Sequence, residues 1–563
     1  MGRTVGIGIQ DFEKIRERNC FYVDKTDFIK EWWESGDDVT LIARPRRFGK
    51  TLNMSMLHQF FSVEYANRGD LFEGLSIWNE EKYREMQGTY PVIYLSFANI
   101  KENDFETTSY RIRQFLMNLY EKHSFLRECD LLSDSEKNYF ERMASDMSEK
   151  DAPLALYQLS DFLYRYYNKK VIILLDEYDT PMQEAYVSGF WDELVSFIRR
   201  LFNSTFKTNP YMEKGIMTGI TRVSKESVFS DLNNLEVVTT TSDKYTTSFG
   251  FTEEEVFNAM DEMGLSDKKK VKEWYDGFMF GSVSDIYNPW SIINYLDKRK
   301  FSAYWANTSS NSLVGSLLRQ GNRRIKEKFE TLIQGGNIKT QIDEQIVYNQ
   351  LDDNEDAIWS LLLASGYLKV VKAGYDYDDG EIYGQTDYEL TLTNGEVRLM
   401  FRRLVSGWFG RDKANYNDFI KAMLLDDLDA MNEYMNRVSE SVFSSFDTGK
   451  KTSKSEPERF YHGFVLGLIV DLQGSYIITS NRESGFGRYD VILHPKKAQD
   501  DAIIIEFKVF NKRKEKSLED TVASALAQIE EKQYDKILTD HGIAPERIRK
   551  YGFAFEGKKV LIG

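Results

Sequence analysis

Residues Leu41 to Thr51 read LIARPRRFGKT, and this stretch decides the fold of the first part of the chain. The end of an apolar strand is followed by Gly49, Lys50 and Thr51, which open an amphipathic segment, LNMSMLHQFF. In the pattern G-x-x-x-x-G-K-[ST], backbone N–H groups surround nucleotide phosphates, the lysine reaches their outer oxygens, and the hydroxyl holds magnesium. Arg44 stands where the first glycine is expected, in a turn that residues with a Cβ enter at a cost. The stretch is therefore most of a phosphate-binding loop.

Such a loop needs an acidic partner at the end of a buried strand, and residues 171–181, VIILLDEYDTP, provide one. Five apolar residues predict a central strand that delivers Asp176 and Glu177 to the carboxyl edge of an open α/β sheet, where ligands bind. We expect Asp176 to hold the water shell of magnesium and Glu177 to polarise the attacking water. The alternative is an apolar strand that ends in an ordinary acidic surface turn. The two segments occur in the expected order, which favours a nucleotide site.

A third strand, KGIMT at 214–218, ends in Thr218, which we expect to sense the terminal phosphate, with Arg222 adding charge nearby. The alternative is that a threonine at a strand end and an arginine in a loop have no special role. The predicted cofactors are ATP and Mg²⁺, with Thr51 and Asp176 at the metal. Because the turn is rich in arginine, we expect charge to help hold the phosphates. The predicted ATP-binding residues of the loop are Arg46, Arg47, Phe48, Gly49, Lys50 and Thr51.

A second constellation lies near the other end of the chain, in residues 485–508, GFGRYDVILHPKKAQDDAIIIEFK. Two strands joined by a polar turn are expected to form a hairpin, with Asp490 near the start of the first and Glu506 near the end of the second. Because side chains alternate between the faces of a strand, Glu506 and Lys508 share one face. Two acids as Mg²⁺ ligands, with a lysine to orient the attacking water, suit phosphodiester hydrolysis. The alternative is a solvated edge strand with a cross-strand ion pair.

Helices flank this predicted hairpin. The preceding segment, PERFYHGFVLGLIVDL, carries Glu458 and His462 one helical turn apart, within reach of a metal cluster. The following segment, TVASALAQIEEKQY, supplies Gln528 and Tyr534. Helix, hairpin, strand and helix would thus enclose one acidic site.

The front half resembles the bacterial AAA-ATPase-like family. The motifs that carry this resemblance are YVDKTDFI, RPRRFGKT, LLDEYDTP, FSDLNN, WYDGF and YNPWSI. Members of the family carry a loop of the Arg-Pro-Arg-Arg-Phe-Gly-Lys type, so Arg44 is an expected variant.

The C-terminal part resembles the PD-(D/E)xK nuclease superfamily, specifically the domain that commonly follows this ATPase-like domain. The resemblance implies that Asp490, Glu506 and Lys508 are the D…ExK core and that Glu458 is its optional helix acid. Gln528 and Tyr534 correspond to a trailing Gln/Tyr helix, with a spacing looser than the strict Q-x-x-x-Y form.

The predicted fold class is α/β multidomain, with a parallel P-loop NTPase sheet covered on both faces by helices. A helical and winged-helix-like middle follows, and the chain ends in an α/β nuclease-like domain. The predicted domains are 1–250 (P-loop AAA-like ATPase core), 251–335 (helical lid), 336–410 (winged-helix-like module), 411–455 (helical connector) and 456–563 (PD-(D/E)xK nuclease-like domain).

Composition limits the partners. The 73 basic and 89 acidic residues give a net charge of −16, so a nucleic acid would have to meet a local basic patch. Arg402, Arg403 and Arg411 hint at one such strip. Two cysteines and five histidines offer neither a disulfide framework nor a zinc motif. With no apolar run long enough to span a membrane and no signal peptide, we expect a cytoplasmic protein without membrane contact.

The leading functional hypothesis is an ATPase whose nucleotide state gates a metal-dependent nuclease acting on nucleic acid, with DNA favoured over RNA. One alternative is an AAA- or STAND-like signalling ATPase with a non-cleaving C-terminal domain that binds nucleic acid or a partner. Another is a scaffold that holds the nucleotide without hydrolysing it. A homo-oligomer stays open, because an arginine such as Arg199, Arg200 or Arg222 would then act on a neighbouring copy.

Overall fold

The computed structural model groups the chain into two compact units. The N-terminal unit comprises residues 1–317 and 335–398, and the C-terminal unit comprises 318–334 and 399–563. The described residues are 3–220, 228–229, 232–306, 314–315, 317–318, 323–342, 351, 355–374, 387–408, 416–442, 465, 469, 472, 475–484, 487–497, 500–557 and 559–563.

The N-terminal unit is built on a five-stranded parallel sheet in the order β2-β3-β4-β1-β5. Its strands are β1 (Val39–Ala43), β2 (Val92–Ser96), β3 (Val171–Asp176), β4 (Met212–Gly219) and β5 (Leu235–Val238). Every residue of β1 and β3 is buried, as expected for central strands of a sheet covered on both faces. The three strands predicted above from apolar runs correspond to β1, β3 and β4, and the sheet also contains β2 and β5. The predicted parallel sheet is confirmed.

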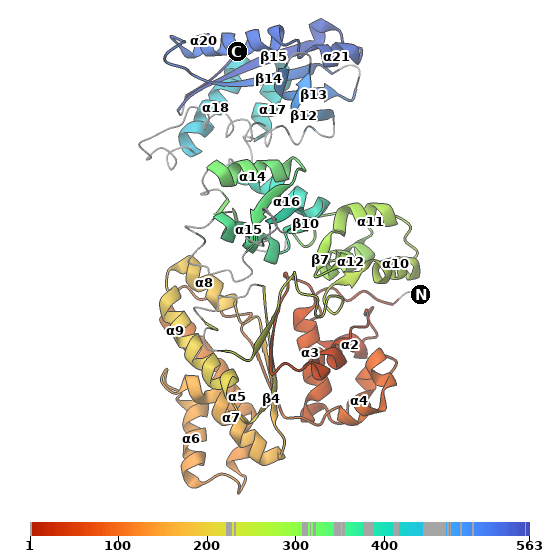
Figure 1. Cartoon of the computed structure of the whole chain (residues 1–563), viewed down its shortest axis with the longest axis vertical. Helices are drawn as coiled ribbons and strands as arrows, with labels where there is room; N and C mark the ends of the chain where they lie inside the picture. Colours follow the sequence, from red (N-terminus) through yellow and green to blue (C-terminus); the bar gives the residue numbers. More distant parts are fainter. Residues whose placement is uncertain are drawn as a thin grey trace, which may run out of the picture. The chain divides into compact units, whose positions relative to one another are not determined.

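Helices cover both faces of this sheet (Figure 1). On one face lie α2, α3 and α4, and on the other lie α5, α7 and α9. Local sequence sets several of the helix ends: α6 starts with a capping box between Ser133 and Glu136, and α7 has a proline in its first turn. The helices are α1 (Phe12–Glu17), α2 (Asp27–Glu34), α3 (Lys50–Phe61), α4 (Glu81–Met86), α5 (Phe105–Lys122), α6 (Asp134–Ser145), α7 (Ala152–Tyr167), α8 (Thr180–Ser188) and α9 (Trp191–Phe202).

The chain turns helical after Thr252, as predicted. Thr252 caps α10 in a capping box with Glu255, and an aromatic cluster that includes Tyr275 and Tyr295 forms the local core. We call residues 251–306 the lid segment. Its elements are β6 (Phe251–Thr252), α10 (Glu253–Glu262), α11 (Lys268–Tyr275), β7 (Phe278–Phe280), β8 (Val283–Tyr287) and α12 (Pro289–Lys298), with the strands paired in the order β6-β8-β7.

The next part of the N-terminal unit has a strand, a helix, two strands and a second helix, in that order. Its elements are β9 (Ile338–Gln341), α15 (Glu355–Ala364), β10 (Leu368–Gly374), β11 (Asp387–Leu392) and α16 (Gly395–Trp408). The strands form an antiparallel sheet in the order β10-β11-β9. Helix α16 begins in the N-terminal unit and continues without a break into the C-terminal unit, to which α14 (Arg323–Ile333) also belongs.

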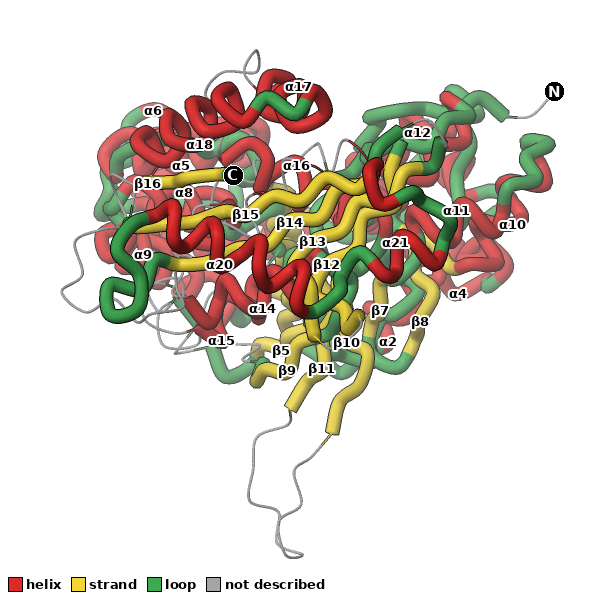
Figure 2. The backbone as a smooth tube through the Cα atoms, turned by 90° about the horizontal axis from the view of Figure 1, so that it is seen from above, coloured by secondary structure: helices red, strands yellow, loops and turns green. Residues whose placement is uncertain are grey.

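The C-terminal unit contains a mixed sheet in the order β12-β13-β14-β15-β16 (Figure 2). Of these described strands, β14 and β15 pair in parallel and the other neighbours pair antiparallel. Because parallel neighbours need a crossover, α20 connects them over one face of the sheet. Residues of α17 and α18 share an apolar core with the opposite face. The elements are α17 (Tyr416–Leu425), α18 (Leu428–Val442), β12 (Tyr476–Ser484), β13 (Gly487–Pro495), β14 (Ala502–Val509), α20 (Leu518–Glu531), α21 (Lys536–Asp540), β15 (Ile548–Glu556) and β16 (Lys559–Ile562).

The architecture confirms the predicted α/β multidomain fold class. Within the described part of the chain, no helix combines the length and the apolar character needed to cross a membrane.

Candidate active sites

The phosphate-binding loop joins β1 to α3. Gly49 has φ 82°, a left-handed conformation that suits glycine and lets α3 begin at Lys50. The Lys50 side chain is buried, and its Nζ donates hydrogen bonds to the carbonyl oxygens of Arg44 (2.8 Å) and Pro45 (2.9 Å). Burial lowers the pKa of Lys50, and the carboxylates that follow β3 partly offset this effect. Lys50 therefore holds the first residues of the loop against the start of α3.

Arg44 points away from the loop opening. Its guanidinium lies 4.3 Å from the centroid of the Phe280 ring and donates to the carbonyl oxygens of Thr239 and Lys244. The side chain is fully buried, and burial lowers the pKa of Arg44 to about 9. We expected arginine charge to help hold phosphates, but for Arg44 this is wrong, because its charge is used to fasten residues 239–244 to the loop.

The other predicted loop residues contact neighbouring segments. Arg46 Nη2 donates to Gln183 Oε1 of α8 at 2.9 Å, and the Arg47 guanidinium stacks 4.5 Å from the Trp290 ring centroid. The Phe48 ring is buried and packs against both phenylalanines of β7, at centroid distances of 4.8 and 5.3 Å. All three side chains therefore tie the loop to surrounding elements of the N-terminal unit.

The acidic pair lies at the carboxyl end of β3, beside Thr218 of β4. Asp176 is fully buried, and its Oδ1 accepts a hydrogen bond from Thr218 Oγ1 at 2.6 Å. The same hydroxyl accepts a bond from the backbone N–H of Glu177 at 3.1 Å, where the chain takes a left-handed φ of 51°. Thr218 therefore positions both acids. Burial raises the pKa of Asp176, whereas the hydroxyls of Thr218 and Thr51 lower it.

These residues fit a magnesium–phosphate group. Within the described residues, no group donates an ordinary hydrogen bond to Asp176 Oδ2, although this atom is buried. A buried carboxylate oxygen without a partner is costly, and a bound Mg²⁺ or one of its waters satisfies it. Thr51 is close enough to influence the pKa of Asp176, as a shared metal site requires. The predicted residue Arg222 lies outside the described residues.

The backbone of the loop is also held by the lid segment. Trp305 Nε1 and Asn288 Nδ2 both donate to the carbonyl oxygen of Arg46, at 3.0 and 3.3 Å. The backbone N–H groups of Trp305 and Ala306 in turn donate to Oε1 of Glu396, at 2.6 and 3.4 Å. The loop is thereby linked through Trp305 to the first turn of α16.

Glu396 is a residue that the sequence reasoning missed. It is fully buried, and Ser291 Oγ donates to its Oε2 at 2.8 Å. Burial raises the pKa of Glu396 to about 7, although these hydrogen bonds act in the opposite direction. The sequence signal was weak, because an acid in the first turn of a helix usually faces solvent and is favoured there by the helix dipole.

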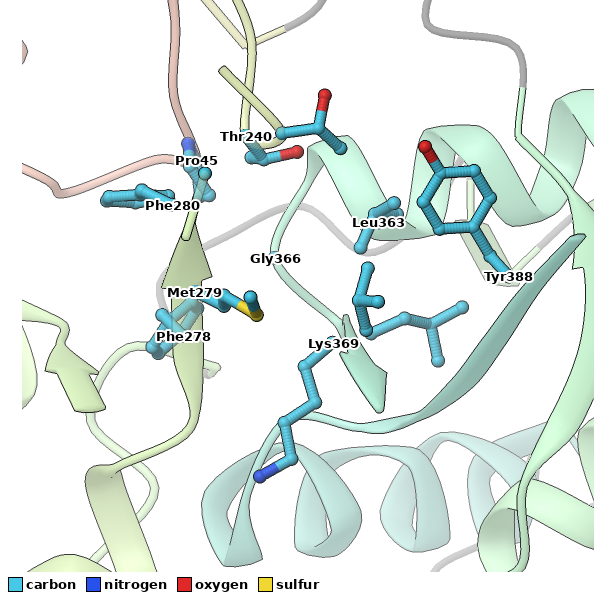
Figure 3. A pocket seen from close by; sticks show the side chains of 13 residues that line it. Pro45, Thr240, Phe278, Met279, Phe280, Leu363, Gly366, Lys369 and Tyr388 are labelled. Carbon is cyan, nitrogen blue, oxygen red and sulfur yellow. The ribbon is translucent and has the colours of Figure 1, made fainter. Parts of the chain in front are cut away.

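A cavity of about 180 Å³ lies beside the loop (Figure 3). Pro45, the phenylalanines of β7, and Leu363 and Gly366 near β10 line it with mostly apolar groups. Gly366 has φ 83°, and a Cβ there would stand 3.0 Å from carbons of Pro45, so glycine permits this close approach. The loop and the α15–β10 region are thus adjacent but leave unfilled space between them.

The lid segment also holds a group of three acids. The carboxylates of Glu253, Asp276 and Asp285 lie close enough together to bind a metal. Lys272 Nζ, however, already forms ion pairs with Glu253 at 2.5 Å and Asp285 at 2.9 Å. Burial raises the pKa of Asp276 to about 6, and Lys272 offsets part of the remaining negative charge of this group.

In the C-terminal unit, the predicted alternation along β14 is confirmed. Ile505 and Phe507 face the core shared with α17 and α18, whereas Glu506 and Lys508 lie on the α20 side. Glu506 is only 3% exposed. A buried acid on this face is unlike the solvated edge strand that was the alternative.

The amide of Gln528 joins the predicted residues of this site. Its Nε2 donates to Glu506 Oε1 and, at 3.2 Å, to the hydroxyl of Tyr534. Its Oε1 accepts a hydrogen bond from Lys508 Nζ at 2.7 Å. One side chain of α20 therefore fixes both the acid and the lysine of the E-x-K strand, in spite of the looser Gln/Tyr spacing.

The structure describes the remaining predicted residues of this site only in part. Val491 of β13 pairs with Ile505 of β14, and extending this antiparallel register by one residue brings Asp490 opposite Glu506. The side chain of Asp490 lies outside the described residues, as do Glu458 and His462. Of the described groups, the buried carboxylate of Glu506 is a hard-oxygen ligand of the kind that Mg²⁺ prefers, whereas the Lys508 ammonium is a neighbouring charge and not a metal ligand.

Two classes of domain are defined by these features: a P-loop NTPase, from the loop and acids on a parallel sheet, and a nuclease-type fold, from the E-x-K strand on a mixed sheet. Residues 6–229 match the family model described as predicted AAA-ATPase, and residues 456–563 match that of the PD-(D/E)XK nuclease superfamily. The chain thus carries an AAA-ATPase-like domain and a C-terminal PD-(D/E)XK nuclease superfamily domain, as the motifs indicated.

The chain is also similar to an uncharacterized protein in the vnfD 5′ region of Azotobacter chroococcum mcd 1. The two are 27% identical over 321 residues, which is 56% of this chain and 56% of that protein. The similarity therefore spans little more than half the length of that relative.

Proposed function

We propose that this protein binds and hydrolyses ATP and that its nucleotide state gates a Mg²⁺-dependent nuclease, with DNA favoured over RNA as substrate. The observation that carries this proposal is the hydrogen-bonded link from the Arg46 carbonyl through Trp305 to Glu396. Glu396 lies in the first turn of α16, and α16 continues into the unit that contains the E-x-K strand. Gating requires that a change at the loop be passed on to that unit, and α16 is the part of the chain through which it would pass.

In the ATPase half, the proposed roles follow from the geometry at the loop. Lys50 is already buried at the loop carbonyls and would exchange them for phosphate oxygens. Thr51 and Asp176 would hold Mg²⁺, which neutralises phosphate charge when bound. Glu177 would orient the attacking water and accept its proton, and Thr218 keeps Glu177 and Asp176 in register.

In the nuclease half, Glu506 and Asp490 would hold Mg²⁺, which polarises the scissile phosphodiester when bound. Lys508 would orient the attacking water and offset charge on the phosphate. Gln528 holds Lys508 and Glu506 with its two amide atoms, so the acid and the lysine keep a fixed separation. This preorganised pair supports cleavage over mere binding.

Gating is supported by how the phosphate-binding loop is held. Its Arg46 carbonyl is bound by two lid residues, so a shift of the loop on nucleotide binding has to move or break these hydrogen bonds. The cavity beside Pro45 leaves room for a second arrangement, which a close-packed interior would forbid. A change at the loop can therefore reach Glu396 and α16.

The test measures ATP turnover and nucleic acid cleavage in the same preparations. We expect Glu506→Ala to abolish cleavage and keep ATP turnover, and Glu177→Gln to abolish turnover and keep nucleotide binding. Lys497→Ala, in the turn at the other end of β14, is the matched surface control and should change neither activity. Cleavage that persists in Glu506→Ala refutes the site assignment. Tight nucleic acid binding without any Mg²⁺-dependent product in the wild type favours the signalling alternative.

A further inference from the structure

The segment between β14 and α20 is a basic loop that neither site accounts for. Residues 511–517 read NKRKEKS, so four of five consecutive positions from 512 to 516 are cationic. All four of these side chains are exposed. We call residues 511–516 the basic loop. This local concentration of positive charge contrasts with the net charge of −16 of the whole chain.

The conformation of the basic loop is fixed by hydrogen bonds. The Glu515 carboxylate accepts bonds from the backbone N–H of Asn511 at 2.7 Å and from Thr521 Oγ1 at 2.9 Å. The Asn511 carbonyl accepts the backbone N–H groups of Lys514 and Glu515, both at 2.9 Å. The single acid of the loop is therefore used to hold its backbone, and the cations are displayed from a defined turn.

Three of the four cations have no acidic partner among the residues that the structure describes. Within the described part of the chain, Arg513, Lys514 and Lys516 form no ion pair, and only Lys512 does, with Glu556 at 3.0 Å. Other cations of the same unit behave differently: Arg549 pairs with Asp501 at 2.6 Å, and nearby basic side chains are paired likewise. Unpaired, ordered cations are available to an external anion.

The basic loop follows directly from the strand of the candidate nuclease site. Lys508 and Lys512 are four residues apart, and Glu506 and Lys512 are six apart. Six residues span at most about 20 Å even when fully extended. That length corresponds to about six phosphates along one strand of B-form DNA, at about 3.4 Å each. A polymer bound at Glu506 therefore has its neighbouring phosphates within reach of the basic loop.

We propose that the basic loop binds the phosphodiester backbone of the nucleic acid and holds it at the Glu506 site; this inference rests on the proposed nuclease function. Arginine and lysine are the side chains that most often contact phosphates, and such contacts position a nucleic acid without reading its sequence. The loop therefore confers affinity that is independent of sequence and strongly dependent on salt. Arg513, Lys514 and Lys516 are binding residues and do not take part in the chemical step.

The test measures binding to the full chain carrying Glu506→Ala, so that the probe is not cut. Fluorescence anisotropy with a short DNA duplex, the matching single strand and an RNA duplex is followed between about 50 and 200 mM salt. In the combined variant Arg513→Gln, Lys514→Gln, Lys516→Gln, the negative slope of log K for binding against log salt should shrink in magnitude by about 2 to 3 on the preferred probe, at about 0.9 per lost phosphate contact with a duplex. The matched control is Lys496→Gln, Lys497→Gln, Lys536→Gln, which removes the same charge elsewhere on the unit and should leave the slope unchanged.

The possible results distinguish a failure of the basic-loop proposal from a failure of the proposed nuclease function. If Glu506→Ala binds nucleic acid and the basic-loop variant has an unchanged slope, the proposal is overturned while the nuclease function stands. An equal loss in the control variant also overturns it, because net charge alone then explains binding. If no probe binds at all, both the loop assignment and the nuclease function fail. With Glu506 restored, the basic-loop variant should raise KM at least tenfold and leave kcat within about twofold, and a loss confined to kcat contradicts a binding role.

Discussion

The buried carboxyl of Glu396 makes a quantitative prediction about pH. No cation pairs with it within the described residues, and burial raises its pKa from the ordinary 4.5 to about 7. The folded protein therefore holds this proton more tightly than the unfolded chain does. The stabilisation is fully present below pH 4.5 and is lost as the pH rises to about 7. The pKa change corresponds to roughly 3 kcal/mol of unfolding free energy.

Glu396→Gln removes the ionisation and keeps an acceptor for the backbone N–H groups of Trp305 and Ala306. At pH 5 the variant and the wild type should differ in stability by less than about 1 kcal/mol, because the folded side chain is neutral in both and only the unfolded Glu396 has ionised. At pH 8 the variant should be more stable by roughly 3 kcal/mol, since the wild type then carries a buried charge. Urea unfolding of the full chain at both pH values, followed through the transition of the N-terminal unit, measures this difference.

The exposed Glu254 provides the control for this experiment. Glu254→Gln removes a surface carboxylate from α10 and should change stability by less than about 0.5 kcal/mol at either pH. A free-energy difference between Glu396→Gln and the wild type that is the same at pH 5 and pH 8 would refute the reasoning, because burial would then not govern the ionisation of Glu396.

Three further predictions concern the two sites and their link. Thr218→Val removes the hydroxyl that holds Asp176 and should lower ATP turnover about 10- to 100-fold, with a smaller effect on ATP affinity. Thr218→Ser keeps the hydroxyl and should retain turnover, and normal turnover in the valine variant would contradict a positioning role. Gln528→Ala should reduce Mg²⁺ affinity and cleavage about 10- to 100-fold without changing ATP turnover, and a parallel loss of turnover would indicate general misfolding. Trp305→Phe keeps an aromatic ring but loses the indole N–H and its hydrogen bond to the Arg46 carbonyl, worth about 1 kcal/mol. This variant should weaken the ATP dependence of cleavage in an assay with and without ATP, and an unaltered ATP response would exclude this link.

Local patterns were enough to predict much of the fold. The apolar runs of β1, β3 and β4 and the alternation along β14 depend on neighbouring residues, so the sequence shows them directly. The assembly of Glu506, Lys508 and Gln528 was also predictable, because a strand periodicity and a following helix bring them to one face.

Contacts between distant residues could not be predicted in this way. Trp305 meets the Arg46 carbonyl across 259 residues, and no local pattern marks either partner. Arg44 stands in a phosphate-binding motif, but its burial against Phe280 depends on the placement of the lid segment. The cations of the basic loop, by contrast, can be read directly from the sequence. The structure adds that the Glu515 carboxylate accepts hydrogen bonds from the Asn511 backbone and from Thr521, so the loop has a fixed conformation, unlike an ordinary run of solvated charges.

The most direct test of the central claim is Mg²⁺-dependent cleavage of DNA and RNA as a function of ATP concentration, in the wild type, Lys50→Ala and Lys508→Ala. The wild type should show a cleavage rate that changes with ATP. Lys50→Ala should cut at the ATP-free rate whatever the ATP concentration, and Lys508→Ala should turn over ATP without cutting. An unchanged ATP response in Lys50→Ala, or cleavage that survives in Lys508→Ala, would contradict a phosphate-binding loop that gates this nuclease site.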